Sequence, residues 1–259
     1  MGKEGGVKVD NHQSLWLVWQ NSVTRLNYHV ATLSYVDNQY EFSYTWKSEG
    51  GQKVRDALEN GYMLHPSFPE LKKTYVASKM FAAFDRRLPS DIRTDYGQIL
   101  EELHLTKQST KMELLEQTRG KLSNDSYSFE KPLKLINGKL VTAFFINGMR
   151  HQKNLPPNWK EILETTNIIK LKLEPENLVD QNAVAVYTGM NIKLGFVPRF
   201  YATAITALIK RGLKPNLKVN YINEDATPDW WLKVDFESEI DTISPKELKD
   251  IDQLFEFAI

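Results

Sequence analysis

The segment 174-EPENLVDQNAVAV-186 carries the clearest fold information in the sequence. Asn177 and Asp180 are spaced for a tight turn, because Asn and Asp side chains accept hydrogen bonds from nearby backbone N–H groups. Asn182 then leads into a run of alternating apolar residues, which is typical of a buried strand. The segment therefore predicts a turn that leads the chain into the interior of a β-rich domain.

The segment 194-LGFVPR-199 predicts the end of the next strand and the start of a helix. Gly195 permits a close backbone approach, and Pro198 fixes the chain direction where the helix begins. The helix is expected to run from Arg199 to Lys210. For Gly195, as for Asn182, a purely structural role in the turns of the domain is equally compatible with the pattern.

Outward from these segments, β-branched and aromatic residues predict strands in both halves of the chain. In the second half the strands cover residues 140–146, 168–173, 183–188, 193–198, 217–222 and 230–236. In the first half they cover 14–20, 28–35 and 39–46, a β-meander with Asp37 and Asn38 in one of its turns. Helices are predicted over 53–60, 78–86, 91–105 and 111–117.

These elements predict an α+β protein of two domains. Residues 1–121 are expected to form a β-meander with helices, 122–138 a polar linker or docking strip, and 139–240 a second β-rich domain. Residues 241–259 are expected to form an acidic C-terminal helix, because Ser244 suits the N-cap and Pro245 the first helical position.

The charge is balanced over the whole chain but unevenly distributed. The formal net charge is +0, with 33 Lys and Arg against 33 Asp and Glu. Residues 139–222 carry 12 Lys and Arg against 5 Asp and Glu, a net charge of +7. Residues 223–259 carry 3 against 11, a net charge of −8. Either these are ordinary solvated faces, or the middle of the chain forms a patch that attracts a polyanion.

The sequence lacks the usual patterns of an enzyme. It has no cysteine, which excludes thiolate nucleophiles, disulfides and Cys-based zinc sites. It has no GxGxxG, P-loop, HExxH or G-x-S-x-G pattern, and its five histidines lie far apart. We therefore expect no catalytic residues, no metal and no cofactor. No run of about 18 apolar residues occurs, so we expect a soluble, cytoplasmic protein that does not enter a membrane.

Three motifs of the second half resemble the HIRAN domain. They are Gly148-Met149-Arg150 after a strand, the pattern E-P-x-N-x-x-D-x-N-A-V-x-V at 174–186, and L-G-F-V-P-R at 194–199. The resemblance covers about residues 140–240 and implies an OB-like β-barrel with one or two helices. It also implies binding of single-stranded or damaged DNA, including a free 3′ end. The first hypothesis is therefore a non-catalytic, DNA-binding adaptor.

The same resemblance implies which residues contact the nucleotide. Arg150 matches a basic residue near the bound nucleotide, and Asp180 matches a carboxylate that accepts a hydrogen bond from a 3′ hydroxyl. Asn177 matches a polar neighbour in that pocket, and Arg199 matches a phosphate contact. Phe196 stands where His or Tyr is common in the family.

The sequence departs from the family pattern where bases would stack. His151 and Gln152 replace aromatic residues after the arginine, and Val179 replaces another in the turn. Base–aromatic stacking contributes roughly 1–3 kcal/mol per base, so end recognition should suffer more than backbone binding. His151 keeps a flat ring that can stack. Trp159, in the long loop 152–167, is expected to be an exposed platform that compensates.

The first half has a looser resemblance to the N-terminal subdomain of HipA-type kinases. It is carried by the order Phe81-Ala82-Ala83-Phe84, Arg87-Leu88-Pro89-Ser90 and Arg93, while the kinase core itself is missing. The resemblance implies that the first half docks a protein partner. It supplies the alternative hypothesis, an antitoxin-like or accessory module that regulates a separate HipA-type kinase in a toxin–antitoxin system.

Deletion of residues 244–259 tests whether the acidic end competes with nucleic acid for the basic surface. The deletion removes part of the segment with a net charge of −8, so it should raise the affinity for a labelled single-stranded oligonucleotide severalfold at low salt. Fluorescence anisotropy measures this affinity. An unchanged or lower affinity would instead assign a structural role to the tail.

Overall fold

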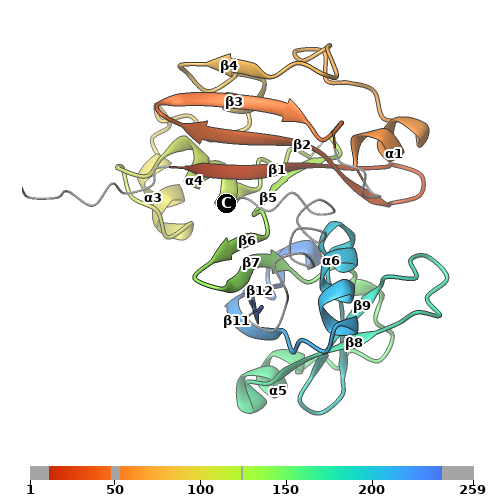
Figure 1. Cartoon of the computed structure of the whole chain (residues 1–259). Coiled ribbons are helices and arrows are strands. Elements are labelled where there is room, and N and C mark those ends of the chain that lie inside the picture. The colour runs from red at the N-terminus through yellow and green to blue at the C-terminus, as the bar shows by residue number, and fades with distance from the viewer. Residues whose placement is uncertain (1–11, 48–52, 124, 241–259) are drawn as a thin grey trace, which may run out of the picture.

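The computed structural model describes residues 12–47, 53–123 and 125–240. They form two lobes that lie against each other, one above the other in Figure 1. Both lobes combine antiparallel sheets with a few helices, which confirms the predicted α+β class. The helix expected at 241–259 lies outside the described residues. In the described part of the chain, no helix has the length and apolar character needed to cross a membrane.

The first lobe contains a five-stranded antiparallel sheet in the order β4-β3-β2-β1-β5. Its strands are β1 (Gln13–Gln20), β2 (Asn27–Val36), β3 (Gln39–Tyr44), β4 (Tyr75–Ala77) and β5 (Tyr127–Glu130). Its helices are α1 (Val54–Glu59), α2 (Ala82–Asp85), α3 (Tyr96–Glu102) and α4 (Lys111–Thr118). The predicted meander is confirmed as β1, β2 and β3. Asp37 and Asn38, both at positive φ, make the turn between β2 and β3.

β5 lies inside the segment 122–138, which we expected to be a linker. It pairs antiparallel with β1, from Trp16 opposite Glu130 to Trp19 opposite Tyr127. The next strand, β6 (Lys134–Ile136), pairs with the second lobe. The segment therefore adds one strand to each lobe. β5 could not be predicted from its polar composition. It is a strand because it pairs with β1, which lies far away in the sequence.

Two helices of the first lobe are shorter than the periodicity predicts. α2 starts at Ala82 rather than at residue 78, and α3 starts at Tyr96 rather than at residue 91. Before α3, the Arg93 guanidinium donates to both carboxylate oxygens of Asp95, at 2.8 and 2.7 Å. Residues two apart do not face each other on a helix, so this pair is compatible with a turn rather than with a helix. The predicted helices over 53–60 and 111–117 are confirmed as α1 and α4.

The second lobe contains two antiparallel sheets, in the orders β11-β12-β7-β6 and β10-β9-β8. Its remaining strands are β7 (Lys139–Phe145), β8 (Ile169–Leu173), β9 (Val184–Thr188), β10 (Lys193–Phe196), β11 (Asn216–Ile222) and β12 (Leu232–Glu239). Its helices are α5 (Trp159–Thr166), α6 (Arg199–Lys210) and the 3₁₀ turns η1 (Met149–His151) and η2 (Pro228–Trp230). Among the described strands, β8 and β11 are edges of separate sheets, so they do not form the closed ring of the expected OB-like barrel.

One bridge between Asn147 and Phe196 joins the two sheets of the second lobe. The N–H group of each residue donates to the carbonyl oxygen of the other, at 2.9 Å in both cases. Gly195 makes this approach possible. Its φ is +157°, and a Cβ at this position would lie 2.4 Å from the Asn147 carbonyl oxygen. The close backbone approach predicted at Gly195 is confirmed.

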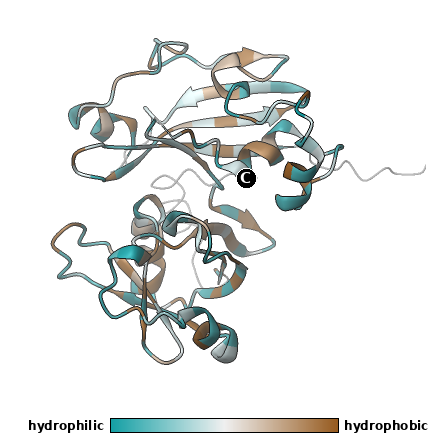
Figure 2. Cartoon of the chain, turned by 180° about the vertical axis from the view of Figure 1, so that it is seen from behind, coloured by the Kyte–Doolittle hydropathy of each residue, from teal (hydrophilic) through white to brown (hydrophobic). Residues whose placement is uncertain are grey.

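Each lobe has its own hydrophobic core, but one tryptophan of the first sheet belongs to the core of the second lobe. Trp16, on β1, is buried and packs among second-lobe residues. Its ring centroid lies 5.6 Å from that of Tyr201 on α6. Trp16 is therefore a core residue of the second lobe although its strand belongs to the first. Figure 2 shows both lobes from behind, with hydrophobic and hydrophilic residues alternating along their strands.

His29, on β2, is a buried histidine that stacks on Trp16 with a centroid distance of 4.4 Å. Lys53 Nζ lies 2.8 Å from its Nδ1. Because an ammonium group only donates, this contact places the ring proton on Nε2, 3.3 Å from Thr32 Oγ1. Burial, and then the charge of Lys53, lowers the pKa of His29 well below 6.5. The folded protein therefore keeps this ring neutral.

We expect the free energy of unfolding to fall as the pH drops below about 6.5 and to be fully retained above it, because the unfolded chain binds a proton at His29 more readily. His65 adds an effect of the same sign, since burial and Arg87 lower its pKa. Urea denaturation at about pH 7.5 and 5.5 measures the loss. His29→Gln should reduce this loss more than His65→Gln does. An unreduced loss in His29→Gln would contradict the prediction.

Candidate nucleic-acid interface

The turn between β8 and β9 is held by the side chains that the sequence predicts for it. Asn177 Oδ1 accepts hydrogen bonds from the backbone N–H groups of Val179, at 3.0 Å, and Asp180, at 3.2 Å. Asp180 Oδ1 accepts one from the N–H group of Asn182, at 2.9 Å. Asn177 and Asp180, which the sequence resemblance predicts to contact a nucleotide, are thus the turn's own backbone acceptors.

Asp180 also holds Arg199, the first residue of α6. Asp180 Oδ2 lies 3.4 Å from Arg199 Nε, and the two side chains are only 13% and 23% exposed. The guanidinium carbon lies 5.6 Å from the ring centroid of Tyr28, on β2 of the first lobe. Nη1 is buried without a hydrogen-bond acceptor among the described residues, and Nε meets Asp180 as an ion pair without hydrogen-bond geometry. Arg199 is therefore held at the junction of the lobes by Asp180 and by the ring of Tyr28.

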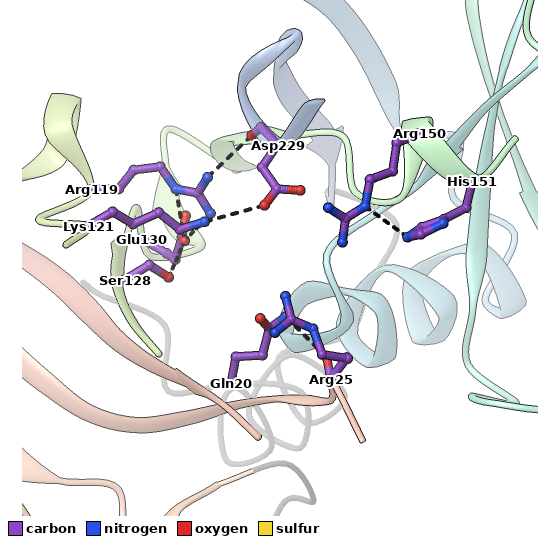
Figure 3. Close-up of polar contacts among 9 residues, drawn as sticks. All are labelled: Gln20, Arg25, Arg119, Lys121, Ser128, Glu130, Arg150, His151 and Asp229. Atoms are coloured by element: carbon purple, nitrogen blue, oxygen red, sulfur yellow. Dashed lines mark hydrogen bonds and ion pairs between the residues drawn. The ribbon is translucent and has the colours of Figure 1, made fainter. Parts of the chain in front are cut away.

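Arg150 and His151 lie on η1, directly after the bridge at Asn147. Both side chains are exposed, and Arg150 Nε lies 2.9 Å from His151 Nε2 (Figure 3). Phe196 is next to this turn, because it is the bridge partner of Asn147. Its ring is half-buried, and Lys193 Nζ lies 4.1 Å from its centroid. The structure thus brings together the basic turn and Phe196, which lie far apart in the sequence.

The prediction that Trp159 is an exposed platform is wrong. Trp159 is 5% exposed and belongs to the core of the second lobe, where its ring stacks on Trp231 with a centroid distance of 6.2 Å. It is the first residue of α5, so half of the expected loop 152–167 is helical. Pro156 and Pro157 suggested an irregular loop, but they only precede a helix start.

A cleft between the lobes was not predicted from the sequence. It has a volume of about 980 Å³ and is lined by residues of both lobes. Its basic residues are Arg25, Arg119 and Lys121 from the first lobe and Arg150 and His151 from the second. Its carboxylates are Asp125, Glu130 and Asp229. Figure 3 shows side chains of both lobes around this space. No sequence motif links these residues, because only the packing of the lobes brings them together.

Arg119 and Glu130 form a buried ion pair at the back of this cleft. The Nε and Nη2 groups of Arg119 donate to Glu130 Oε1 at 3.1 and 2.5 Å, and the side chains are 10% and 5% exposed. The guanidinium carbon lies 5.1 Å from the Trp230 ring centroid and 5.4 Å from that of Phe145, both in the second lobe. This pair is therefore part of the joint between the lobes rather than a free cation.

The other two carboxylates of the cleft are also paired. Asp229 lies 3.6 Å from Lys121 Nζ, and Asp125 pairs with Arg87. Burial, and then the charge of Arg119, lowers the pKa of Lys121, whereas Asp229 opposes this shift. The part of the chain that the structure describes contains no group of three or more side chains able to hold a metal ion.

Comparison with known proteins identifies a class for the second lobe. Residues 140–240 match the family model described as the HIRAN domain. Two solved structures are similar to parts of the chain. The HIRAN domain of human HLTF is 17% identical, with a TM-score of 0.31, over 47% of this chain and 90% of that one. A protein from Lactobacillus plantarum is 20% identical, with a TM-score of 0.31, over 39% of this chain and 97% of that one. No curated protein matches the chain.

The family match begins and ends within the second lobe, so the resemblance of the first lobe to HipA-type kinases stays a prediction. The roles of Arg150, His151, Asn177, Asp180, Phe196 and Arg199 in binding likewise stay predictions. Arg150 and His151 form an exposed basic turn. Asn177, Asp180 and Arg199 form a side-chain network that holds the β8–β9 turn and the start of α6.

Replacement of Trp159 by Ala distinguishes a core residue from a binding platform. Because this ring is buried, we expect the variant to lose about 3–5 kcal/mol of unfolding free energy, as large-to-small core substitutions do. Urea denaturation measures this loss. The folded fraction should keep its affinity for single-stranded DNA. A stable variant with reduced affinity would contradict the core assignment.

Proposed function

We propose that this protein is a non-catalytic, nucleic-acid-binding protein whose second lobe binds single-stranded DNA. The match of residues 140–240 to the HIRAN domain carries the proposal, because this domain is a nucleic-acid-binding module. The exposed Arg150–His151 turn lies beside Phe196 in that domain. A guanidinium group donates several hydrogen bonds to phosphate and also stacks on bases, so it suits either part of a nucleotide.

The side chains around this turn favour contacts to the backbone over contacts to bases. Val179, in the β8–β9 turn, is 71% exposed but has no ring on which a base could stack. Gln152 is likewise not aromatic. Phe196 is half-buried, and a lysine lies over its ring. We therefore infer that phosphate contacts supply most of the affinity, and that recognition of a free 3′ end contributes little.

The first lobe, in this proposal, docks a protein partner as the HipA-like pattern implies. The alternative function, regulation of a separate HipA-type kinase, uses the same lobe. A DNA titration separates the two, because only the first function requires binding to DNA.

We expect labelled single-stranded DNA to bind at low salt, with free and blocked 3′ ends within about twofold of each other, and with a steep loss of affinity as salt rises. Arg150→Ala should weaken binding severalfold and reduce the slope of log K against log salt by about 0.7, the value for one lost phosphate contact on a single strand. Fluorescence anisotropy at several salt concentrations provides both numbers. Arg199→Ala should also weaken binding, but with a loss of stability, because it leaves Asp180 unpaired.

Arg211→Ala is the matched control, since it removes the same charge from the end of α6, where among the described residues the Arg211 side chain donates to Ala207 of its own helix. Its affinity should stay close to that of the starting protein. Absence of binding at low salt would refute the proposed function. Equal effects of Arg150→Ala and Arg211→Ala would move the site away from η1.

A further inference from the structure

We propose that the cleft between the lobes is the continuation of the nucleic-acid interface, and that Arg25 of the first lobe contacts the phosphate backbone of a strand held at Arg150. This inference rests on the proposed function, because it assumes that the second lobe binds a single strand. It adds a binding role for the first lobe, which neither the family match nor the sequence motifs assign.

The basic residues of the cleft are not all compensated by its carboxylates. Each of its carboxylates already has a basic partner, as Glu130 has Arg119 and Asp229 has Lys121. Among the described residues, Arg25 and Arg150 line the same cleft without a carboxylate partner. Figure 3 shows these two side chains on opposite sides of the space, one from each lobe. Two uncompensated guanidinium groups facing a shared cleft favour a ligand with more than one negative charge.

The loop that carries Arg25 is held by its own hydrogen bonds. Asn21 Oδ1 accepts hydrogen bonds from the N–H groups of Val23, at 2.8 Å, and Thr24, at 2.9 Å. The N–H group of Arg25 donates to the Asn21 carbonyl oxygen at 3.0 Å, and the Arg25 carbonyl accepts from Gln20 Nε2 at 3.2 Å. These bonds fix the backbone from which the exposed Arg25 side chain extends.

The backbone of Arg25 is itself unusual. Its φ is +60°, a left-handed conformation that non-glycine residues adopt at a cost and that is enriched at functional sites. Asn or Gly would fit this position with less strain. The side chain that this left-handed backbone carries lines the cleft.

The character of the cleft decides the class of ligand. Its volume of about 980 Å³ lies at the upper end of the range for small-molecule sites, which are mostly apolar. Here the lining is mainly polar, and Leu122, Phe200 and Trp230 are its main apolar residues. A solvated, mostly polar cleft with spare guanidinium groups suits a sugar–phosphate backbone better than an apolar metabolite.

Replacement of Asp229 also tests this inference, because it should raise the affinity for a strand rather than lower it. Its side chain is 47% exposed, and its carboxylate lies 3.6 Å from Lys121 Nζ. A backbone phosphate entering the cleft meets this negative charge. Asp229→Asn should remove the repulsion and free Lys121, so it should raise the affinity for a long strand severalfold while keeping the shape of the side chain.

A length series with two arginine variants tests the inference directly. The probes are labelled oligothymidylates of about 4 and about 16 nucleotides, the range of site sizes for single OB-type modules. Arg25→Asn keeps the left-handed backbone, and Arg25→Lys keeps the charge. We expect Arg25→Asn to leave the affinity for the short probe unchanged. It should weaken binding of the long probe severalfold, with a salt slope smaller by about 0.7, and Arg25→Lys should restore most of the loss.

Arg55→Ala, on α1 and away from the cleft lining, is the matched control in the first lobe and should leave both affinities unchanged. If Arg25→Asn behaves like Arg55→Ala with the long probe while Arg150→Ala still weakens binding, the cleft inference is overturned and the proposed function stands. If neither probe binds the starting protein at low salt, the proposed function fails and the inference fails with it. Thermal unfolding of each variant confirms that it is folded.

Discussion

The burial of Trp16 in the core of the second lobe is the interaction on which the arrangement of the protein depends. Trp16 belongs to β1, the strand that pairs with both β2 and β5 of the first sheet. Its ring nevertheless packs against Tyr201 and lies within the hydrophobic cluster of the other lobe. An aromatic side chain buries about 150–250 Å², so separating the lobes would expose a large apolar surface. The two lobes are therefore expected to move little relative to each other.

The contacts around this joint determine what the cleft can offer to a ligand. Arg119 is held by Glu130 and lies beside two aromatic rings of the second lobe, so its charge is already compensated inside the protein. Arg199 is held by Asp180 over Tyr28. The basic side chains available to a ligand are those without an ion pair at the junction of the lobes. For this reason the exposed Arg150 and the loop residue Arg25 are better placed for binding than the more buried arginines.

The sequence predicts local features well where they depend on neighbouring residues. The turn at Asn177 and Asp180, the close approach at Gly195 and the meander of the first sheet all follow from short-range rules, and the structure contains each of them. It predicts poorly what depends on distant partners. β5 is a strand only because β1 lies beside it, and Trp159 is buried only because Trp231 and its neighbours cover it. The cleft could not be predicted from the sequence either, because its lining residues come from both lobes.

A second lobe at the binding surface offsets the missing aromatic platforms. A single strand is held by stacking of its bases and by neutralisation of its phosphates, and these two contributions substitute for one another in overall affinity. Near η1 the protein has few exposed rings. A short row of phosphate-binding residues on the second lobe alone would therefore bind a single strand weakly and with little selectivity. Extending the row of phosphate contacts across the cleft to Arg25 adds charge without requiring a ring, and the burial of Trp16 in the second-lobe core sets the distance between Arg25 and Arg150. A protein built in this way would bind strands according to their length rather than their sequence or their ends.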